Sequence, residues 1–125
     1  MNVPADLKYT KEHEWVKVDG NIAAVGITDF AQSELGDVVF IELPSVGSDV
    51  ELMKSFGTIE AVKAVSEIFS PLSGKIAEVN GLLEDDPMTV NRDPYGEGWI
   101  IKIELSDPAE VDQLLDAGDY QKLVE

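Results

Sequence analysis

The sequence predicts a mainly β domain, a flattened sandwich of two small sheets with short peripheral helices and a helix at the C-terminal end. Three observations lead to this prediction. Short apolar runs recur along the chain, and turn-forming residues separate them. Apolar residues make up 44% of the 125 residues, which is enough for a buried core. This length suits one domain, so we expect residues 1–125 to form a single unit.

Seven segments are expected to be strands. An Asp19-Gly20 pair between two apolar runs is a hairpin signal. A second hairpin, over residues 56–69, is expected to present Lys63 and Ala64 at its tip. The expected strands are residues 14–18, 22–27, 38–43, 56–62, 65–69, 75–79 and 99–105.

A short helix is expected over residues 29–35. Thr28 or Asp29 can cap its N-terminus, and Gly36 would end it. Two further segments are expected to lack regular structure: residues 80–87, a mobile loop, and residues 91–98, a stretch dense in turn formers.

The C-terminal segment 107–125 has a helical pattern. Asp107 is a capping acid and Pro108 stands at the first helical position. Gly118 is expected to stop this helix, and Asp119 can cap a last turn.

Composition limits the classes of function. The chain has 25 acids against 9 bases, a net charge of −16, so phosphate backbones and anionic membranes would repel it. Basic protein surfaces are the natural partners, although acidity also serves plain solubility. There is no cysteine, which excludes disulfides and thiolate metal sites, and His13 is the only histidine. The start has no hydrophobic signal sequence, and no long apolar stretch follows, so a cytoplasmic location is expected.

Lys63 stands alone in an apolar stretch, with no other base between Lys54 and Lys75. A catalytic amine needs burial or a neighbouring cation, but Glu60 and Glu67 favour its protonated form. Two readings remain open from the residues. Lys63 is a gatekeeper charge that discourages aggregation, or it is an exposed attachment point on a rigid hairpin.

Six motifs resemble the H proteins of the glycine cleavage system, a family of lipoyl carriers. They cover nearly the whole chain in the family's order, and together they are very specific. Biotin carriers usually have methionine on both sides of the modified lysine, and lipoyl domains of 2-oxoacid dehydrogenases have aspartate before it, whereas Val62 and Ala64 flank Lys63 here. The motifs are HEWV (13–16), GITDFAQ (26–32), LGDVVFIELP (35–44), IEAVKA (59–64), SPLSGKI-EVN (70–80) and PYGEGW (94–99).

The resemblance implies a barrel-sandwich hybrid fold and a carrier that catalyses nothing itself. Lipoate would be joined to Lys63 by an amide, within an attachment motif that includes Glu60, Val62 and Ala64. The implied partners are a pyridoxal-phosphate glycine decarboxylase, a tetrahydrofolate-dependent aminomethyltransferase, a flavin-dependent dihydrolipoyl dehydrogenase that uses NAD, and a lipoate ligase or lipoyl transferase. Three positions depart from the family's usual residues: Ala61 (often serine), Phe30 (often histidine) and Glu67 (often aspartate).

The family folds its loaded arm against the protein body, where carboxylates hold the cationic aminomethyl group. Glu14 and Glu67 match the family positions for this role, and Glu12 is a neighbour that can help. His13 has no partner evident in sequence, and we interpret it as structural or as a contact near the cleft.

Other residues and roles stay open. Trp15 and Trp99 are expected in the core, and Arg92 either anchors its loop or touches a partner. Two alternative functions are a relay that donates lipoate to other dehydrogenase complexes and an unmodified interaction module.

Overall fold

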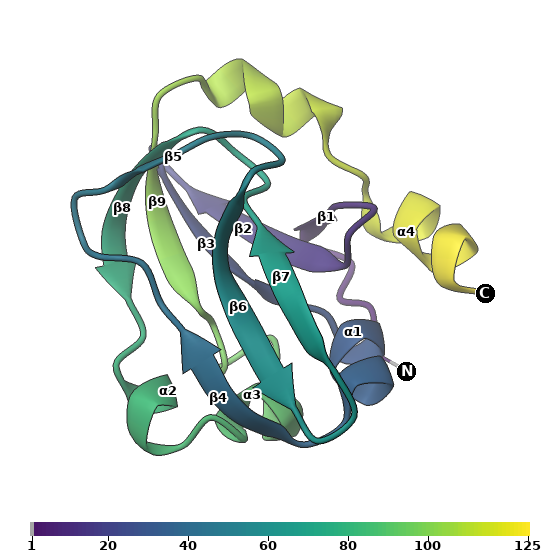
Figure 1. Ribbon diagram of the computed structural model, residues 1–125. Helices are drawn as coiled ribbons and strands as arrows, with labels where there is room; N and C mark the ends of the chain where they lie inside the picture. Colours follow the sequence, from purple (N-terminus) through teal and green to yellow (C-terminus); the bar gives the residue numbers. More distant parts are fainter. Residues whose placement is uncertain (1) are drawn as a thin grey trace.

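The computed structural model describes residues 2–125, and within them the strands form two antiparallel sheets (Figure 1). The larger sheet has six strands in the order β1-β2-β3-β9-β8-β5, and the smaller has three in the order β4-β6-β7. The expected sandwich is therefore confirmed, but the sheets stay separate and do not close into a barrel. The strands are β1 Lys8–Tyr9, β2 Glu14–Asp19, β3 Ile22–Ile27, β4 Val38–Glu42, β5 Asp49–Val50, β6 Ser55–Ala61, β7 Val65–Phe69, β8 Gly74–Val79 and β9 Ile101–Leu105.

The main core lies between the two sheets. Ile101 and Ile103 of β9 face it from the larger sheet, and Ile41, Ile59 and Ile68 face it from the smaller one. These residues alternate with more exposed neighbours along their strands, as the twofold period of a strand requires. Burying each such side chain contributes about 1.5–3 kcal/mol to the free energy of unfolding.

A second, aromatic cluster lies on the other face of the larger sheet. Trp15 belongs to it, whereas its neighbour Val16 points into the main core. The indole of Trp15 lies over Gly26, where a Cβ would stand 2.6 Å from its Nε1, so this position requires glycine. Tyr9 and Tyr120 stack with ring centroids 4.6 Å apart, which joins β1 to the C-terminal helix.

Helices cover the ends of the sandwich. The first helix begins after Thr28, whose hydroxyl accepts the Ala31 N–H, and it ends at Gly36 as expected. In Figure 1 it lies beside the tip of the β6–β7 hairpin. The helices are α1 Asp29–Leu35, α2 Leu82–Asp85, α3 Thr89–Arg92, the 3₁₀ helix η1 Pro108–Gln113 and α4 Ala117–Val124.

The C-terminal segment is helical, but one expected boundary was wrong. Gly118 lies inside α4 and does not stop a helix. Asp116 caps α4 by accepting the backbone N–H of Asp119, 2.8 Å away, so Asp119 is not the cap. Asp107 caps η1 as expected.

Two other expectations need correction. Residues 80–87 and 91–98 are not wholly irregular, because α2 lies within the first and α3 ends in the second. Trp99 is half-buried at the edge of the aromatic cluster, with the Lys102 Nζ 4.8 Å from its ring centroid, whereas Trp15 is buried as expected.

Candidate functional site

Lys63 is exposed at the tip of the β6–β7 hairpin, as the sequence predicts. The pairing of Glu60 with Val65 ends the ladder, and the Ala61 N–H donates to the Ala64 carbonyl at 2.8 Å to close the turn. Among non-glycine residues of 2–125, only His13 and Met53 have positive φ. The tip therefore uses no left-handed residue, which explains why it lacks the glycine or asparagine of a tight two-residue turn.

The tip is held from outside the hairpin. The Val62 N–H donates to the Asp37 carbonyl at 3.0 Å, so the tip is tied to the segment between α1 and β4. Asn91 of α3 fixes that segment, because its Oδ1 accepts the Val38 N–H at 2.9 Å and its Nδ2 donates to the Gly36 carbonyl at 2.8 Å. These bonds make the platform under Lys63 rigid.

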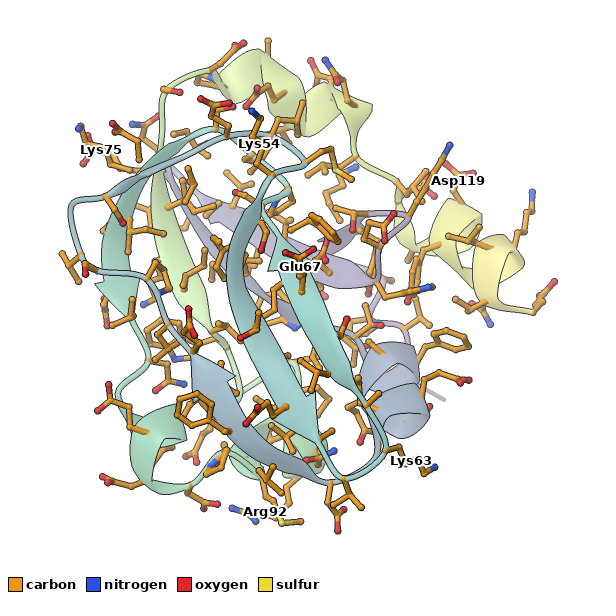
Figure 2. The ribbon with its side chains drawn as sticks, in the orientation of Figure 1. Lys54, Lys63, Glu67, Lys75, Arg92 and Asp119 are labelled. Carbon is orange, nitrogen blue, oxygen red and sulfur yellow. The ribbon has the colours of Figure 1, made fainter. Side chains whose placement is uncertain are left out.

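The stem of Lys63 packs against Gly36. A Cβ at Gly36 would stand 3.4 Å from both Cδ and Cε of the lysine. Figure 2 shows Lys63 at the end of the hairpin beside α1, with Glu67 further along β7. The lysine is thus placed next to the helix that forms one side of a cleft.

The cleft has a volume of about 400 Å³ and lies among α1, β6, β7 and the turn that precedes β2. Apolar side chains make up much of its lining, together with four carboxyl groups. The apolar residues are Ile27, Phe30, Ala31, Leu35, Ile59 and Ile68, and the acids are Glu12, Glu14, Glu34 and Glu67. The structure therefore brings together the three acids named from sequence, and it adds Glu34.

Sequence reasoning missed Glu34, although a signal for it existed. Phe30 and Glu34 are four residues apart on α1, so they lie on the same face of the helix. An acid one turn after an apolar residue on a surface helix is common, and only the fold shows that this face borders the cleft.

Glu14 is the buried acid of the cleft, with only 2% of its surface exposed. The Thr10 hydroxyl donates to its Oε1 at 2.6 Å, and the Phe69 N–H makes a long contact of 3.4 Å with its Oε2. Burial raises the pKa of Glu14 to about 7; the bonds from Thr10 and Phe69 oppose the shift, and the charge of Glu12 adds to it. A cation in the cleft would favour its ionised form.

Glu12 and Glu67 have a different setting, because both are exposed. They line the cleft at its solvent side, and Glu67 pairs in register with Thr58 of β6. Charges at such positions attract a cation more weakly than a buried carboxylate does, since water screens them.

His13 does have a partner, contrary to the expectation from sequence. Its Nδ1 lies 2.8 Å from the hydroxyl of Tyr120 on α4, 107 residues away in the chain. Its ring lies 4.7 Å from that of Phe30, centroid to centroid. No local pattern could reveal this contact, because it depends on how the C-terminal helix packs.

Arg92 forms an ion pair with Asp86, which links α3 to the segment after α2. It therefore anchors its own loop.

Within residues 2–125, no group of three histidine, cysteine, aspartate or glutamate side chains could hold a metal ion. No helix in the same range is long and apolar enough to cross a membrane.

Comparison with known proteins decides the family. A family model described as Glycine cleavage H-protein matches residues 7–125. The chain belongs to the glycine cleavage H-protein family. Within this family, the glycine cleavage system H protein of Symbiobacterium thermophilum is 62% identical over 119 residues, which span 95% of this chain and 93% of that protein. The glycine cleavage system H protein of Carboxydothermus hydrogenoformans is 58% identical over 123 residues, spanning 98% of this chain and 95% of the relative.

A solved structure in the H-protein family has the same fold. The crystal structure of a glycine cleavage system H protein from Mycobacterium marinum superimposes with a TM-score of 0.89 at 40% sequence identity. The match covers 96% of this chain and 97% of that one. The resemblance inferred from the sequence motifs is confirmed.

Proposed function

We propose that this chain is the lipoyl-bearing carrier of the glycine cleavage system, acting as one lipoyl-carrier domain with lipoate joined to Lys63. It would carry the aminomethyl group of glycine from a pyridoxal-phosphate decarboxylase to a tetrahydrofolate-dependent aminomethyltransferase. A dihydrolipoyl dehydrogenase would then reoxidise it. The observation that carries the proposal is the exposed Lys63 on a braced hairpin beside an acid-lined cleft, in a chain of the H-protein family.

The residues around Lys63 fit an attachment site. Val62 and Ala64 are exposed on either side of it, and Glu60 is exposed where the ladder ends. Ala64 is small, so an attaching enzyme could approach the backbone closely. Joining lipoate by an amide removes the charge of the lysine and makes the protein still more acidic.

The cleft fits the arm and its cargo. Its volume of about 400 Å³ lies in the range of small-molecule sites, and its apolar lining suits an aliphatic chain with two sulfurs. When bound, lipoate supplies a disulfide, the group that accepts the aminomethyl unit as glycine loses carbon dioxide. The carboxylate of Glu14 would pair with the cationic amine of the cargo, and the apolar lining would exclude water that hydrolyses it.

The exposed acids would attract the cargo before it reaches Glu14, and they would attract it more weakly than Glu14 does. Glu12 and Glu67 would draw the cationic cargo toward the cleft from its solvent side, since they line it without being buried. We assign no catalytic residue to this chain, because its groups hold and shelter a cargo and an arm on which three other enzymes act.

The net charge of −16 suits transient docking to basic faces of those enzymes. A lipoate ligase or lipoyl transferase would be the fourth partner. The cytoplasmic location expected from sequence is part of the same proposal. A relay to other dehydrogenase complexes and an unmodified module are not favoured, because the relatives cited above are named for glycine cleavage.

The decisive experiment is the intact mass of the protein purified from its native cell with lipoate supplied. We expect the mass of the polypeptide plus one lipoyl group, and fragmentation should place that group on Lys63. The variant Lys63→Arg should stay unmodified and inactive in a reconstituted glycine cleavage assay, whereas Lys54→Arg should behave as the unaltered protein. An unmodified native sample, or full activity of Lys63→Arg, would refute the proposal.

A further inference from the structure

A single buried hydroxyl joins the C-terminal helix to the cleft. Tyr120 is fully buried, and it is the buried residue of α4. Its hydroxyl lies 2.8 Å from Nδ1 of His13 and 2.7 Å from the hydroxyl of Thr28. Tyr120 does not line the cleft, so anything it does there must act through its partners.

One partner belongs to the turn that carries two cleft acids. His13 stands between Glu12 and Glu14, in a turn closed by a bond of 3.2 Å from the His13 N–H to the Thr10 carbonyl. The backbone of His13 has φ of 69°, a left-handed conformation that is costly for a side chain with a Cβ. Such a conformation persists only where the surroundings fix it.

The other partner begins the helix on the opposite side of the cleft. The Thr28 hydroxyl accepts the N–H of Ala31, a cleft residue, and so caps α1. The Thr28 N–H donates to the His13 carbonyl at 3.0 Å, which joins the turn and the helix directly. The hydroxyl of Tyr120 therefore lies where the two sides of the cleft meet.

We propose that Tyr120 is a positioning residue for the cargo cleft: its hydroxyl fixes His13, and through it the Glu12–Glu14 turn, against α1. The proposal rests on the proposed carrier function, since it assigns the C-terminal helix a part in sheltering the loaded arm. Phe30 completes the arrangement, because the imidazole is held between its ring at 4.7 Å and the Tyr120 ring at 5.7 Å, centroid to centroid.

The proton positions follow from the chemistry of the three groups. Burial raises the pKa of Tyr120 to about 12, so its hydroxyl keeps its proton at neutral pH. Burial also lowers the pKa of His13, and the charges of Glu12 and Glu34 oppose that shift. A neutral His13 that accepts a hydrogen bond from the Tyr120 hydroxyl at Nδ1 carries its own proton on Nε2. The Thr28 hydroxyl then donates a hydrogen bond to the oxygen of Tyr120.

The test compares two tyrosines of the same stack. Tyr120→Phe keeps the ring on Tyr9 and removes the hydroxyl from His13 and Thr28. Tyr9→Phe is the matched control, because it removes a buried hydroxyl that donates to the Pro4 carbonyl at 2.6 Å instead. Lipoylated forms of both are loaded with labelled glycine and the decarboxylase, isolated, and followed for release of the labelled carbon as formaldehyde.

We expect Tyr120→Phe to shorten the half-life of the cargo by roughly three- to tenfold, the effect of one hydrogen bond, and Tyr9→Phe to leave it unchanged. His13 is the only histidine, so its ring nitrogens give one set of NMR signals. These should show the Nε2–H tautomer in the unaltered protein and in Tyr9→Phe, and a mixture in Tyr120→Phe. Equal half-lives for Tyr120→Phe and the unaltered protein would overturn the proposal.

A double-variant cycle separates positioning from general loss of stability. In a His13→Phe background, adding Tyr120→Phe should change the cargo half-life no further, because the group that Tyr120 acts through is gone. An additive effect of the two changes would overturn the proposal. If Tyr120→Phe does not fold, the His13→Phe variant alone is the test, and an unchanged cargo half-life in that variant would overturn the proposal. Failure of the unaltered protein to become lipoylated or loaded would instead refute the carrier function.

Discussion

At the scale of single residues, Glu14 combines burial with a carboxyl group that, in the proposed function, pairs with the cationic cargo. Burial raises its pKa to about 7, so at neutral pH the empty cleft holds a mixture of the acid and its anion. A cationic cargo stabilises the anion and shifts the pKa downward again. Glu14 is thus only partly ionised in the empty cleft at neutral pH, and a bound cation shifts it toward the fully ionised form.

The first prediction concerns cargo retention in Glu14→Gln. The amide can still accept the Thr10 hydroxyl, but it has no charge. We expect the half-life ratio of unaltered protein to variant to approach one at low pH and to rise with pH, with its midpoint below the empty-cleft pKa of about 7, because the cationic cargo lowers the pKa of Glu14 and only the anion pairs with the amine. Formaldehyde release measures the half-lives. Glu12→Gln should have a smaller effect, and a ratio independent of pH would contradict the role of Glu14.

The second prediction concerns the stability of the arm-free protein. The folded state binds the Glu14 proton more tightly than the unfolded chain, where the pKa is near its ordinary 4.5. The resulting stabilisation is fully present below pH 4.5 and is lost as the pH rises through about 7. The free energy of unfolding of the unaltered protein, relative to Glu14→Gln, should fall between pH 4.5 and 8 by at most about 3 kcal/mol.

Urea unfolding at several pH values tests this second prediction. Glu67→Gln is the matched control, because it makes the same substitution at an exposed acid of the same cleft. Parallel pH profiles for the unaltered protein and Glu14→Gln would show that Glu14 is not desolvated in solution.

At the scale of elements, the position of Lys63 depends on segments distant in sequence. The hairpin alone leaves the tip free to move, since an isolated two-stranded ribbon is only marginally stable. The bond from Val62 to Asp37 and the contacts of Asn91 join the tip to α1, β4 and α3. Gly36 lies at the centre of this junction, because its carbonyl accepts the Asn91 Nδ2–H and it packs against the stem of Lys63.

The third prediction is the cost of Gly36→Ala. Gly36 has φ of 81° and ψ of −160°, a region that residues with a Cβ hardly enter. We expect the free energy of unfolding to fall by about 1–3 kcal/mol, as measured by urea denaturation. Gly20→Ala is the control, because Gly20 also has positive φ, at 64°, but a Cβ there meets nothing within 4 Å. A smaller loss in Gly36→Ala than in Gly20→Ala would contradict this account of the junction.

The sequence predicts elements best where one local rule dominates. Alternation placed β2, β3 and β7 almost to the residue, and the Thr28 cap placed α1. The prediction that Gly118 stops a helix failed. A glycine that ends a helix and a glycine in the first turn of one cannot be told apart in sequence until the residue that caps the helix, here Asp116, is known. The single turns α2 and α3 were missed because they are too short to show a helical period.

In the candidate site, too, the sequence predicts the residues near local motifs but not the contacts that depend on the fold. Lys63, Glu12, Glu14 and Glu67 lie close in sequence to recognisable motifs, and the structure places the acids in one cleft. The contact between His13 and Tyr120 could not be predicted, because it spans 107 residues and depends on tertiary packing.

At the scale of the whole molecule, charge shapes how the chain meets its partners. Its acids outnumber its bases by 25 to 9. The ion pairs among the described residues, such as Lys75 with Asp49, are exposed and contribute little to stability. The excess negative charge instead creates a long-range field that draws basic surfaces and discourages association of the chain with itself.

The fourth prediction follows from that field. In steady-state assays of the decarboxylase with the lipoylated chain as substrate, KM for the chain should rise steeply as NaCl is raised from about 0.01 to 0.2 M, because the screening length shrinks from about 30 Å to below 10 Å. The kcat should change little, since steering acts on encounter and not on the chemical step. KM for glycine is the internal control, because a small zwitterion gains nothing from steering. A KM for the chain that follows that of glycine would mean that docking depends on apolar contact, and the charge would then serve solubility alone.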